Sequence, residues 1–336
     1  MSFSVGIIGL PNVGKSTLFK ALTKNPVDIA AYPFTTIHPN VGVVHVPDER
    51  LEKIAEVIKP EKITPTVIEF IDIAGLVKDA HKGEGLGNQF LAHIRNCDAI
   101  VEVVRGFDDP NVEHVAGIID PKRDIEIVKT ELLMKDLETL ENSTAKEKQE
   151  NKKLKLLNKI KDWVSQGKLI SNLDLTTEEK SEIKEYQFLT QKPIGFILNT
   201  DGNKEFNLDI QYLAMNLKDE KEISELSEKE AKELQIEPKL DQLILDCYNI
   251  LDLITFYTVA GGKETRAWTL KKGLRAPDAG GVVHTDFEKK FIRAEVISWQ
   301  KLVEAGNWHR ARELGLIRTV GRDYEVEDGD VIEFKI

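Results

Sequence analysis

The sequence predicts an α/β fold in which one α/β domain carries an inserted pair of helices and is followed by a smaller α+β domain. Short apolar runs alternate with helical patterns in the N-terminal third, and the strand pattern resumes after the insertion. Between 124 and 188, leucines and isoleucines recur at three- and four-residue spacing, which is typical of amphipathic helices. We therefore expect the α/β domain over 1–123 and 191–252, the insertion over 124–190, and a separate domain over 253–336.

The α/β domain has the alternation expected of a sheet covered by helices on both faces. Strands are expected at 5–9, 41–46, 67–71, 99–104 and 192–198, and helices at 15–23, 51–58 and 87–95. The C-terminal domain shows short strand patterns at 256–259, 266–270 and 331–335, separated by glycine-rich turns.

The insertion has two apolar stripes separated by a polar stretch. The apolar positions are Ile125, Val128, Leu132, Leu154, Leu157, Ile160 and Val164. Residues 141–153 contain no large apolar side chain. This pattern predicts two long helices with a polar tip. The hairpin either stabilises the core or serves as a docking arm, and the pattern leaves both readings open.

Composition restricts the function classes. The 336 residues carry a net charge of −11, whereas 253–336 are nearly neutral, so any local basic surface is expected there. No apolar run approaches the ~20 residues that cross a bilayer, and the N-terminus lacks the pattern of a signal peptide. Cys97 and Cys247 lie too far apart for a metal-binding spacing, so we expect two reduced thiols, no membrane association and a cytoplasmic location.

A phosphate-binding loop is predicted at residues 9–16, where GLPNVGKS fits the pattern G-x-x-x-x-G-K-[ST] between a strand and a helix. Backbone N–H groups and the helix N-terminus surround phosphates there. Lys15 is expected to reach the β- and γ-phosphates of a nucleoside triphosphate and to act in catalysis, and Ser16 to bind Mg²⁺. The nucleotide-binding candidates are Gly9, Pro11, Asn12, Val13, Gly14, Lys15, Ser16 and Thr17.

A further segment, residues 72–75, matches a nucleotide-sensing part of such enzymes. Asp72 ends an apolar strand in a D-x-x-G pattern and is expected to hold Mg²⁺, while the amide of Gly75 senses the γ-phosphate. Related GTPases place a water-orienting glutamine next, but Leu76 stands there. The catalytic group must then come from a bound cation, a partner or elsewhere in the chain, and His81 in a glycine-rich loop is the candidate.

The base-reading segment departs from guanine specificity. Recognition of guanine by N-K-x-D depends on its last residue, whose carboxylate accepts two hydrogen bonds from the base. Here Asn199 is followed by Thr200, Asp201 and Gly202, so the acid lies one residue early. We assign base contacts to Asn199, Thr200 and Met215, and the segment argues against a dedicated GTPase.

With these residues in view, the chain resembles the Obg-like ATPase (YchF) family along nearly its whole length. The most specific segments are 9–16, 32–40, 72–88, 284–289 and 291–294. The resemblance implies a P-loop GTPase-like domain, the helical insertion and a C-terminal TGS domain of β-grasp shape. It also implies a preference for ATP and association with the large ribosomal subunit, through rRNA or a ribosomal protein.

The resemblance also carries three residue roles. The family's switch threonine falls on Thr36 as a Mg²⁺ ligand, its proposed catalytic histidine on His81, and the asparagine of potassium-activated relatives on Asn12, which adds K⁺ to Mg²⁺ as a cofactor. Gly202 departs from the family, which usually has N-x-x-E at the base-reading site.

Three functions follow from the sequence. The first is a regulatory, Mg²⁺-dependent ATPase that binds the ribosome. The second is a GTPase of the same class with relaxed base reading, and the third is a scaffold that binds a nucleotide without hydrolysing it. Intact Lys15, Ser16, Thr36 and Asp72 argue against the scaffold.

Overall fold

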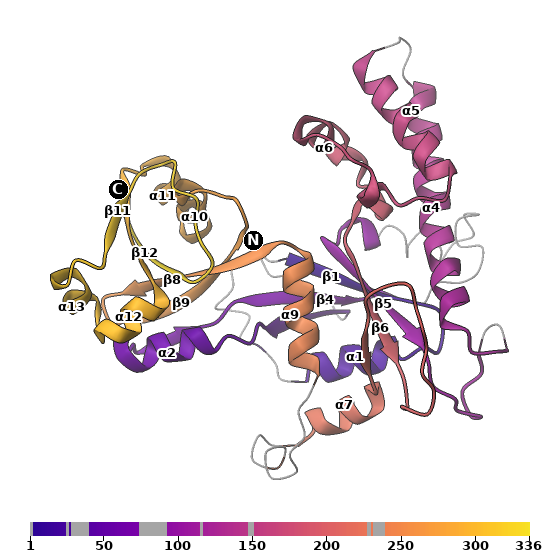
Figure 1. The fold of residues 1–336 in the computed structure, drawn as a ribbon, viewed down its shortest axis with the longest axis horizontal. Coiled ribbons are helices and arrows are strands. Elements are labelled where there is room, and N and C mark those ends of the chain that lie inside the picture. Colours follow the sequence, from indigo (N-terminus) through magenta and orange to yellow (C-terminus); the bar gives the residue numbers. More distant parts are fainter. Residues whose placement is uncertain are drawn as a thin grey trace.

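The computed structural model describes residues 3–24, 27, 40–73, 93–114, 117–146, 151–226, 230 and 239–336. Two six-stranded sheets form two bodies, and a helical arm projects from one of them (Figure 1). The α/β fold class with an inserted helical hairpin is confirmed. Of the expected helix at 87–95, only 93–95 lies within the described residues, and these three residues are helical.

The first sheet has the strand order β2-β4-β1-β5-β6-β7. Its strands are β1 (Phe3–Ile8), β2 (Val41–His45), β4 (Val67–Asp72), β5 (Ala99–Arg105), β6 (Ile194–Asn199) and β7 (Leu213–Met215). All neighbours are parallel except β2 and β4. The central strands are apolar because helices pack against the sheet: α1 (Lys15–Leu22), α9 (Leu240–Ile250) and the first half of α4 (Pro121–Lys146). The carboxyl ends of β1, β4, β5 and β6 therefore meet at one edge, where such sheets bind ligands.

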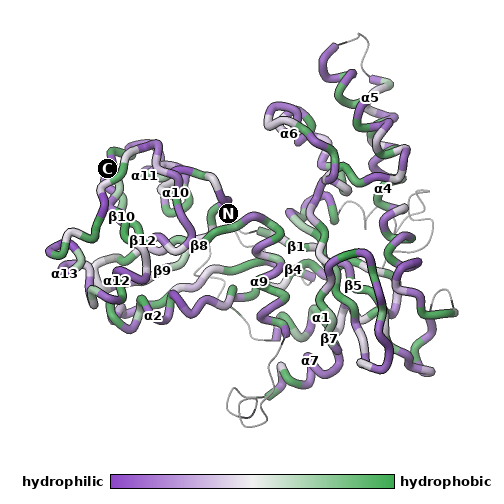
Figure 2. Tube along the Cα trace, in the orientation of Figure 1, coloured by the Kyte–Doolittle hydropathy of each residue, from purple (hydrophilic) through white to green (hydrophobic). Residues whose placement is uncertain are grey.

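The arm consists of the second half of α4 and α5 (Lys152–Ser165), as the apolar stripes predict. Leu140 of α4 packs with Leu157 and Ile160 of α5 in a core separate from that of the sheet. The short helices α6 (Thr177–Ile183), η3 (Ile170–Asn172), η4 (Lys184–Tyr186) and η5 (Leu189–Gln191) lead back to β6. Along the arm, hydrophobic and hydrophilic residues alternate (Figure 2), as an amphipathic pair requires. None of the described helices combines the length and apolarity needed to cross a membrane.

A buried carboxylate anchors the arm to the sheet. Asp136 of α4 is fully buried, and it accepts hydrogen bonds from Leu189 N (2.8 Å), Thr190 N (2.7 Å) and Thr190 Oγ1 (2.7 Å). Because Leu189 and Thr190 belong to η5, directly before β6, these bonds fix where the chain re-enters the sheet.

The second sheet has the order β11-β10-β12-β8-β9-β3. Its C-terminal strands are β8 (Leu253–Ala260), β9 (Glu264–Lys271), β10 (Arg293–Ser298), β11 (Arg318–Val320) and β12 (Asp330–Lys335). The adjacent helices are α10 (Ala276–Val283), α11 (Thr285–Lys289), α12 (Trp299–Ala305) and α13 (Trp308–Glu313). β8 and β12 are parallel neighbours, and Phe256 and Phe334 pack with Ala276 and Ala279 of α10. A mixed sheet packed against a helix in this way is the expected β-grasp arrangement.

One segment of the N-terminal part crosses to the second sheet, which the sequence did not reveal. β3 (Lys62–Thr64) pairs in parallel with β9, and α2 (Glu49–Ile58) packs beside α12 and β9 (Figure 1). Directly before α2, Asp48 accepts a hydrogen bond from Tyr257 OH (2.5 Å), and in the first turn of α2 Arg50 pairs with Asp328 (2.6 Å). The residues between β2 and β4 thus join the two bodies.

We expect Asp136→Ala to lower the free energy of unfolding by about 3 kcal/mol, because buried donors that lose their acceptor cost roughly 1–3 kcal/mol each. Urea denaturation monitored by circular dichroism measures the change. Glu138→Ala on the same helix is the matched control, since this carboxylate is half-exposed and pairs with Lys135 in a surface ion pair worth about 0–1 kcal/mol. Equal losses in the two variants would contradict the anchoring role.

Candidate functional site

The loop between β1 and α1 folds as the phosphate-binding pattern predicts. Gly9 (φ 142°) and Gly14 (φ 109°) have left-handed backbones, and a Cβ at Gly9 would lie 2.4 Å from the Val103 carbonyl oxygen. Asn12 also has a positive φ (62°), which asparagine tolerates better than most residues. The loop therefore curls tightly and returns its backbone to the start of α1.

Lys15 lies inside this curl. Its Nζ donates hydrogen bonds to the carbonyl oxygens of Gly9 (3.2 Å) and Leu10 (2.9 Å), and the residue is only 8% exposed. Burial lowers the pKa of Lys15 to about 8, and the carboxylate of Asp72 opposes the shift. A polyanion beside the loop would favour the charged ammonium, since opposite charges stabilise each other more strongly where water is excluded.

Ser16 and Asp72 bring two oxygen atoms together beside the loop. The Ser16 hydroxyl at the start of α1 donates to Asp72 Oδ2 at 3.1 Å, because β4 runs parallel to β1 and ends next to the loop. A hydroxyl and a carboxylate are ligands that suit Mg²⁺ when phosphate oxygens complete its shell. The predicted Thr36, Gly75 and His81 lie outside the described residues, as does Leu76.

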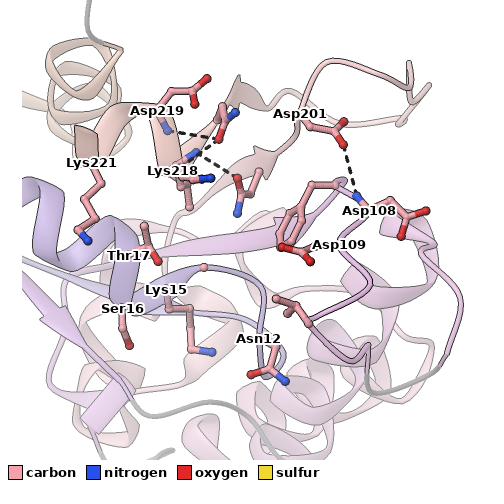
Figure 3. A pocket seen from close by; sticks show the side chains of 16 residues that line it. Asn12, Lys15, Ser16, Thr17, Asp108, Asp109, Asp201, Lys218, Asp219 and Lys221 are labelled. Carbon is pink, nitrogen blue, oxygen red and sulfur yellow. Dashed lines mark hydrogen bonds between the residues drawn. The ribbon is translucent and has the colours of Figure 1, made fainter. Parts of the chain in front are cut away.

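A pocket of about 740 Å³ extends from the loop across the ends of β5 and β6 (Figure 3). Its lining combines predicted and unpredicted residues: Asn12, Gly14, Lys15, Ser16, Thr17, Phe107, Asp108, Asp109, Val112, Asn199, Asp201, Asn216, Leu217, Lys218, Asp219 and Lys221. The predicted Gly9, Pro11, Val13, Thr200 and Met215 are not part of this lining.

Asn199 is braced between two walls of the pocket. Its Nδ2 donates to the Val13 carbonyl oxygen (2.9 Å), and its Oδ1 accepts from Leu217 N (3.1 Å). The side chain therefore ties the phosphate-binding loop to the start of α7 (Leu217–Ser224). Thr200 N donates to the Met215 carbonyl oxygen (3.0 Å), which holds the end of β6 against β7.

Asp201 faces the pocket although it lies one residue early in the base-reading pattern. Its Oδ2 accepts a long hydrogen bond from Asp108 N (3.5 Å) and its Oδ1 one from Asn203 N (3.0 Å); the latter is the main reason that its pKa is lowered. Gly202 has φ 81°, and a Cβ built there would meet no described atom within 4 Å. The backbone at 202 therefore favours glycine, and 201 is the position that brings a carboxylate to the site.

Sequence reasoning missed the wall formed by Phe107, Asp108, Asp109 and Val112. The available signal was position: these residues follow the buried strand β5, whose carboxyl end lies between those of β1 and β6. Lys218 and Lys221 of α7 belong to no recognisable sequence motif. They reach the pocket because α7 packs against α1.

Comparison with known proteins agrees with this geometry. Residues 4–159 match the family model described as "50S ribosome-binding GTPase", and 253–336 match the YchF-GTPase C-terminal model, described as a protein of unknown function. Two curated relatives, from Bacillus subtilis and Haemophilus influenzae, are 44% and 45% identical, and each alignment covers 100% of this chain and 99% of the relative. Both relatives are named "Ribosome-binding ATPase YchF".

The solved structure of the Schizosaccharomyces pombe YchF GTPase has the same fold as this chain. It superposes with a TM-score of 0.85 at 35% identity, covering 99% of this chain and 98% of that one. Full-length similarity of this degree extends to both sheets and the arm. The chain therefore belongs to the YchF family.

Proposed function

We propose that this protein is a ribosome-associated ATPase that hydrolyses ATP with Mg²⁺ in the cytoplasm. The observation that carries the proposal is the curled loop around Lys15, with the Ser16–Asp72 pair beside it at 3.1 Å. This arrangement suits the triphosphate and the metal ion of a P-loop enzyme. The names of the curated relatives support ATP as the nucleotide and the ribosome as the partner.

In this proposal each residue has a defined task. The backbone N–H groups of the loop and the Lys15 ammonium bind the β- and γ-phosphates, and Ser16, Asp72 and Thr36 hold Mg²⁺. The metal ion neutralises phosphate charge. The Gly75 amide senses the γ-phosphate. Asn12 provides an amide oxygen for K⁺ at the loop, since its Nδ2 is the atom that donates to Glu113 O (3.3 Å).

The base is proposed to lie between Phe107 and Leu217, two apolar side chains that line the pocket. Adenine suits this site because Asn199 and nearby backbone groups offer donors and acceptors without requiring a carboxylate. The second candidate is a GTPase with relaxed base reading, and the position of Asp201 in the pocket lining is the observation that favours it.

Ribosome binding is proposed for the arm at 124–190 or the TGS domain at 253–336, with 1–123 and 191–252 forming the nucleotide-binding domain. The description "50S ribosome-binding GTPase" for the model matching 4–159 supports the large subunit as the partner, through rRNA or a ribosomal protein. With a net charge of −11, the chain would approach RNA through a local surface rather than through its overall charge.

The proposed function is tested by measuring ATP hydrolysis with and without purified ribosomes. We expect Mg²⁺-dependent turnover that ribosomes stimulate.

Lys15→Ala should abolish tight ATP binding, since it removes a charge-assisted contact to phosphate. Lys20→Ala, on the same helix, is the matched control and should behave as the wild type. Unchanged ATP affinity in Lys15→Ala would overturn the assignment of the nucleotide site. If ribosomes neither changed turnover nor co-sedimented with the protein, the ribosome would not be its partner.

His81 is proposed as the catalytic histidine because Leu76 cannot orient water. We expect His81→Ala to reduce turnover by about 10²–10⁴-fold, the usual contribution of an acid–base or positioning group, while ATP affinity stays unchanged. His93→Ala, which removes an exposed histidine side chain from the described part of the chain, provides the control. Wild-type turnover in His81→Ala, at constant K⁺ and Mg²⁺, would exclude this role.

We expect the protein to bind ATP at least as tightly as GTP. Guanine presents two donors to a carboxylate at the fourth position, and losing that acceptor at Gly202 costs on the order of 1–3 kcal/mol. Calorimetry with both nucleotides gives the affinity ratio, which should be the same in Asp201→Ala. A preference for GTP that disappears in Asp201→Ala would instead establish guanine recognition by Asp201.

A further inference from the structure

Arg105 is a fully buried arginine at the end of β5, and its guanidinium faces backbone oxygens. It donates hydrogen bonds from Nε to Phe107 O (3.2 Å), from Nη1 to Glu113 O (3.3 Å) and from Nη2 to Val112 O (2.9 Å). Its Cζ also lies 4.4 Å from the centroid of the Phe107 ring. One side chain thus contacts both ends of the loop 107–113.

This loop forms the wall of the pocket opposite α7, and Phe107, Asp108, Asp109 and Val112 line the cavity (Figure 3). The hydrogen bonds inside the loop are local: Asn111 N donates to Asp109 Oδ1 (2.8 Å), and Val112 N donates to Asp109 O (3.1 Å). Asp108 N makes a long contact to Asp201, beyond the end of β6 (3.5 Å). Each of these bonds fixes one point of the loop, whereas Arg105 joins the start of the loop to its end.

The same guanidinium links the wall to the phosphate-binding loop. Glu113 O, which accepts from Arg105 Nη1, also accepts from Asn12 Nδ2 (3.3 Å). Directly after Glu113, His114 Nε2 lies 2.9 Å from Asp124 Oδ2, and this fixes the far side of the loop to α4. Within the described part of the chain, Arg105 of β5 therefore makes three hydrogen bonds to the wall, and the phosphate-binding loop makes one, from Asn12.

We propose that Arg105 is a positioning residue that sets the base-side wall of the nucleotide pocket. The inference rests on the proposed function, because it assigns the wall to the base and ribose of ATP. An arginine is required because its planar guanidinium directs several N–H donors at once to separate oxygens while its face packs on an aromatic ring. Lysine would keep the charge and lose this geometry.

The phosphates and the base of ATP should depend differently on Arg105. In the proposed function, residues 9–16 bind the phosphates and share with Arg105 the hydrogen-bond acceptor Glu113 O, whereas the base lies against the loop that Arg105 holds. Arg105→Lys and Arg105→Met should therefore weaken ATP binding by about tenfold, equivalent to about 1.4 kcal/mol. Binding of Mg²⁺-tripolyphosphate should change by less than about twofold, since it has no base.

The experiment measures both affinities by calorimetry for the full chain, with thermal denaturation of every variant. Arg95→Lys is the matched control. This half-buried arginine donates to Tyr186 O (3.3 Å) and Thr139 Oγ1 (2.8 Å) but is not part of the pocket lining, so its ratio of ATP to tripolyphosphate affinity should stay at the wild-type value.

The outcomes are distinct. A selective loss of ATP affinity in both Arg105 variants, absent from Arg95→Lys, supports the positioning role. Equal losses for ATP and tripolyphosphate, or no loss for either ligand, overturn it. If Arg105→Met does not fold, Arg105→Lys decides the matter. A wild-type chain that binds neither ligand would refute the proposed function itself rather than the role of Arg105.

Discussion

The amide of Asn199 connects the three segments on which the site depends. It donates to Val13 O in the phosphate-binding loop and accepts from Leu217 N at the start of α7, while its own backbone ends β6. An amide can satisfy a buried acceptor and a buried donor at once, which neither aspartate nor leucine could do. Close packing accompanies this bond, since a Cβ at Gly14 would lie 2.6 Å from Asn199 Nδ2. The curled loop, the end of the sheet and α7 therefore hold one another in place.

Within that frame, the charges of the site suit the polyanion and the metal ion of the proposed function. The Lys15 ammonium is buried at a cost that lowers its pKa, and loop carbonyls and Asp72 only partly compensate. The Ser16–Asp72 pair provides oxygens beside it. The wall on the other side has a second buried cation, Arg105, whose donors are engaged by backbone oxygens. In the proposed function, Lys15 thus binds phosphate, whereas Arg105 holds the loop that forms the wall.

The segment that joins the two sheets is continuous in sequence with the strand that ends at Asp72. After β2, the chain passes through α2 and β3, which belong with the C-terminal sheet, and returns as β4 to end at Asp72. Asn40 O at the start of this path accepts a hydrogen bond from Asp72 N (2.9 Å) at its end. The metal-binding candidate and the contacts to the C-terminal domain therefore share one continuous segment.

The sequence by itself determined the α/β fold, the helical pair and the phosphate-binding loop, because each is encoded locally. Strand and helix periodicity, and glycines where the backbone must be left-handed, are visible in consecutive residues. The predicted Ser16 and Asp72 do lie together, whereas the roles of Thr36, Gly75 and His81 stay predictions. Only the tertiary structure decided which side chains form the rest of the pocket. The wall held by Arg105, the bracing of Asn199 and the crossing of α2 to the second sheet depend on contacts between residues far apart in the sequence, which no local pattern records.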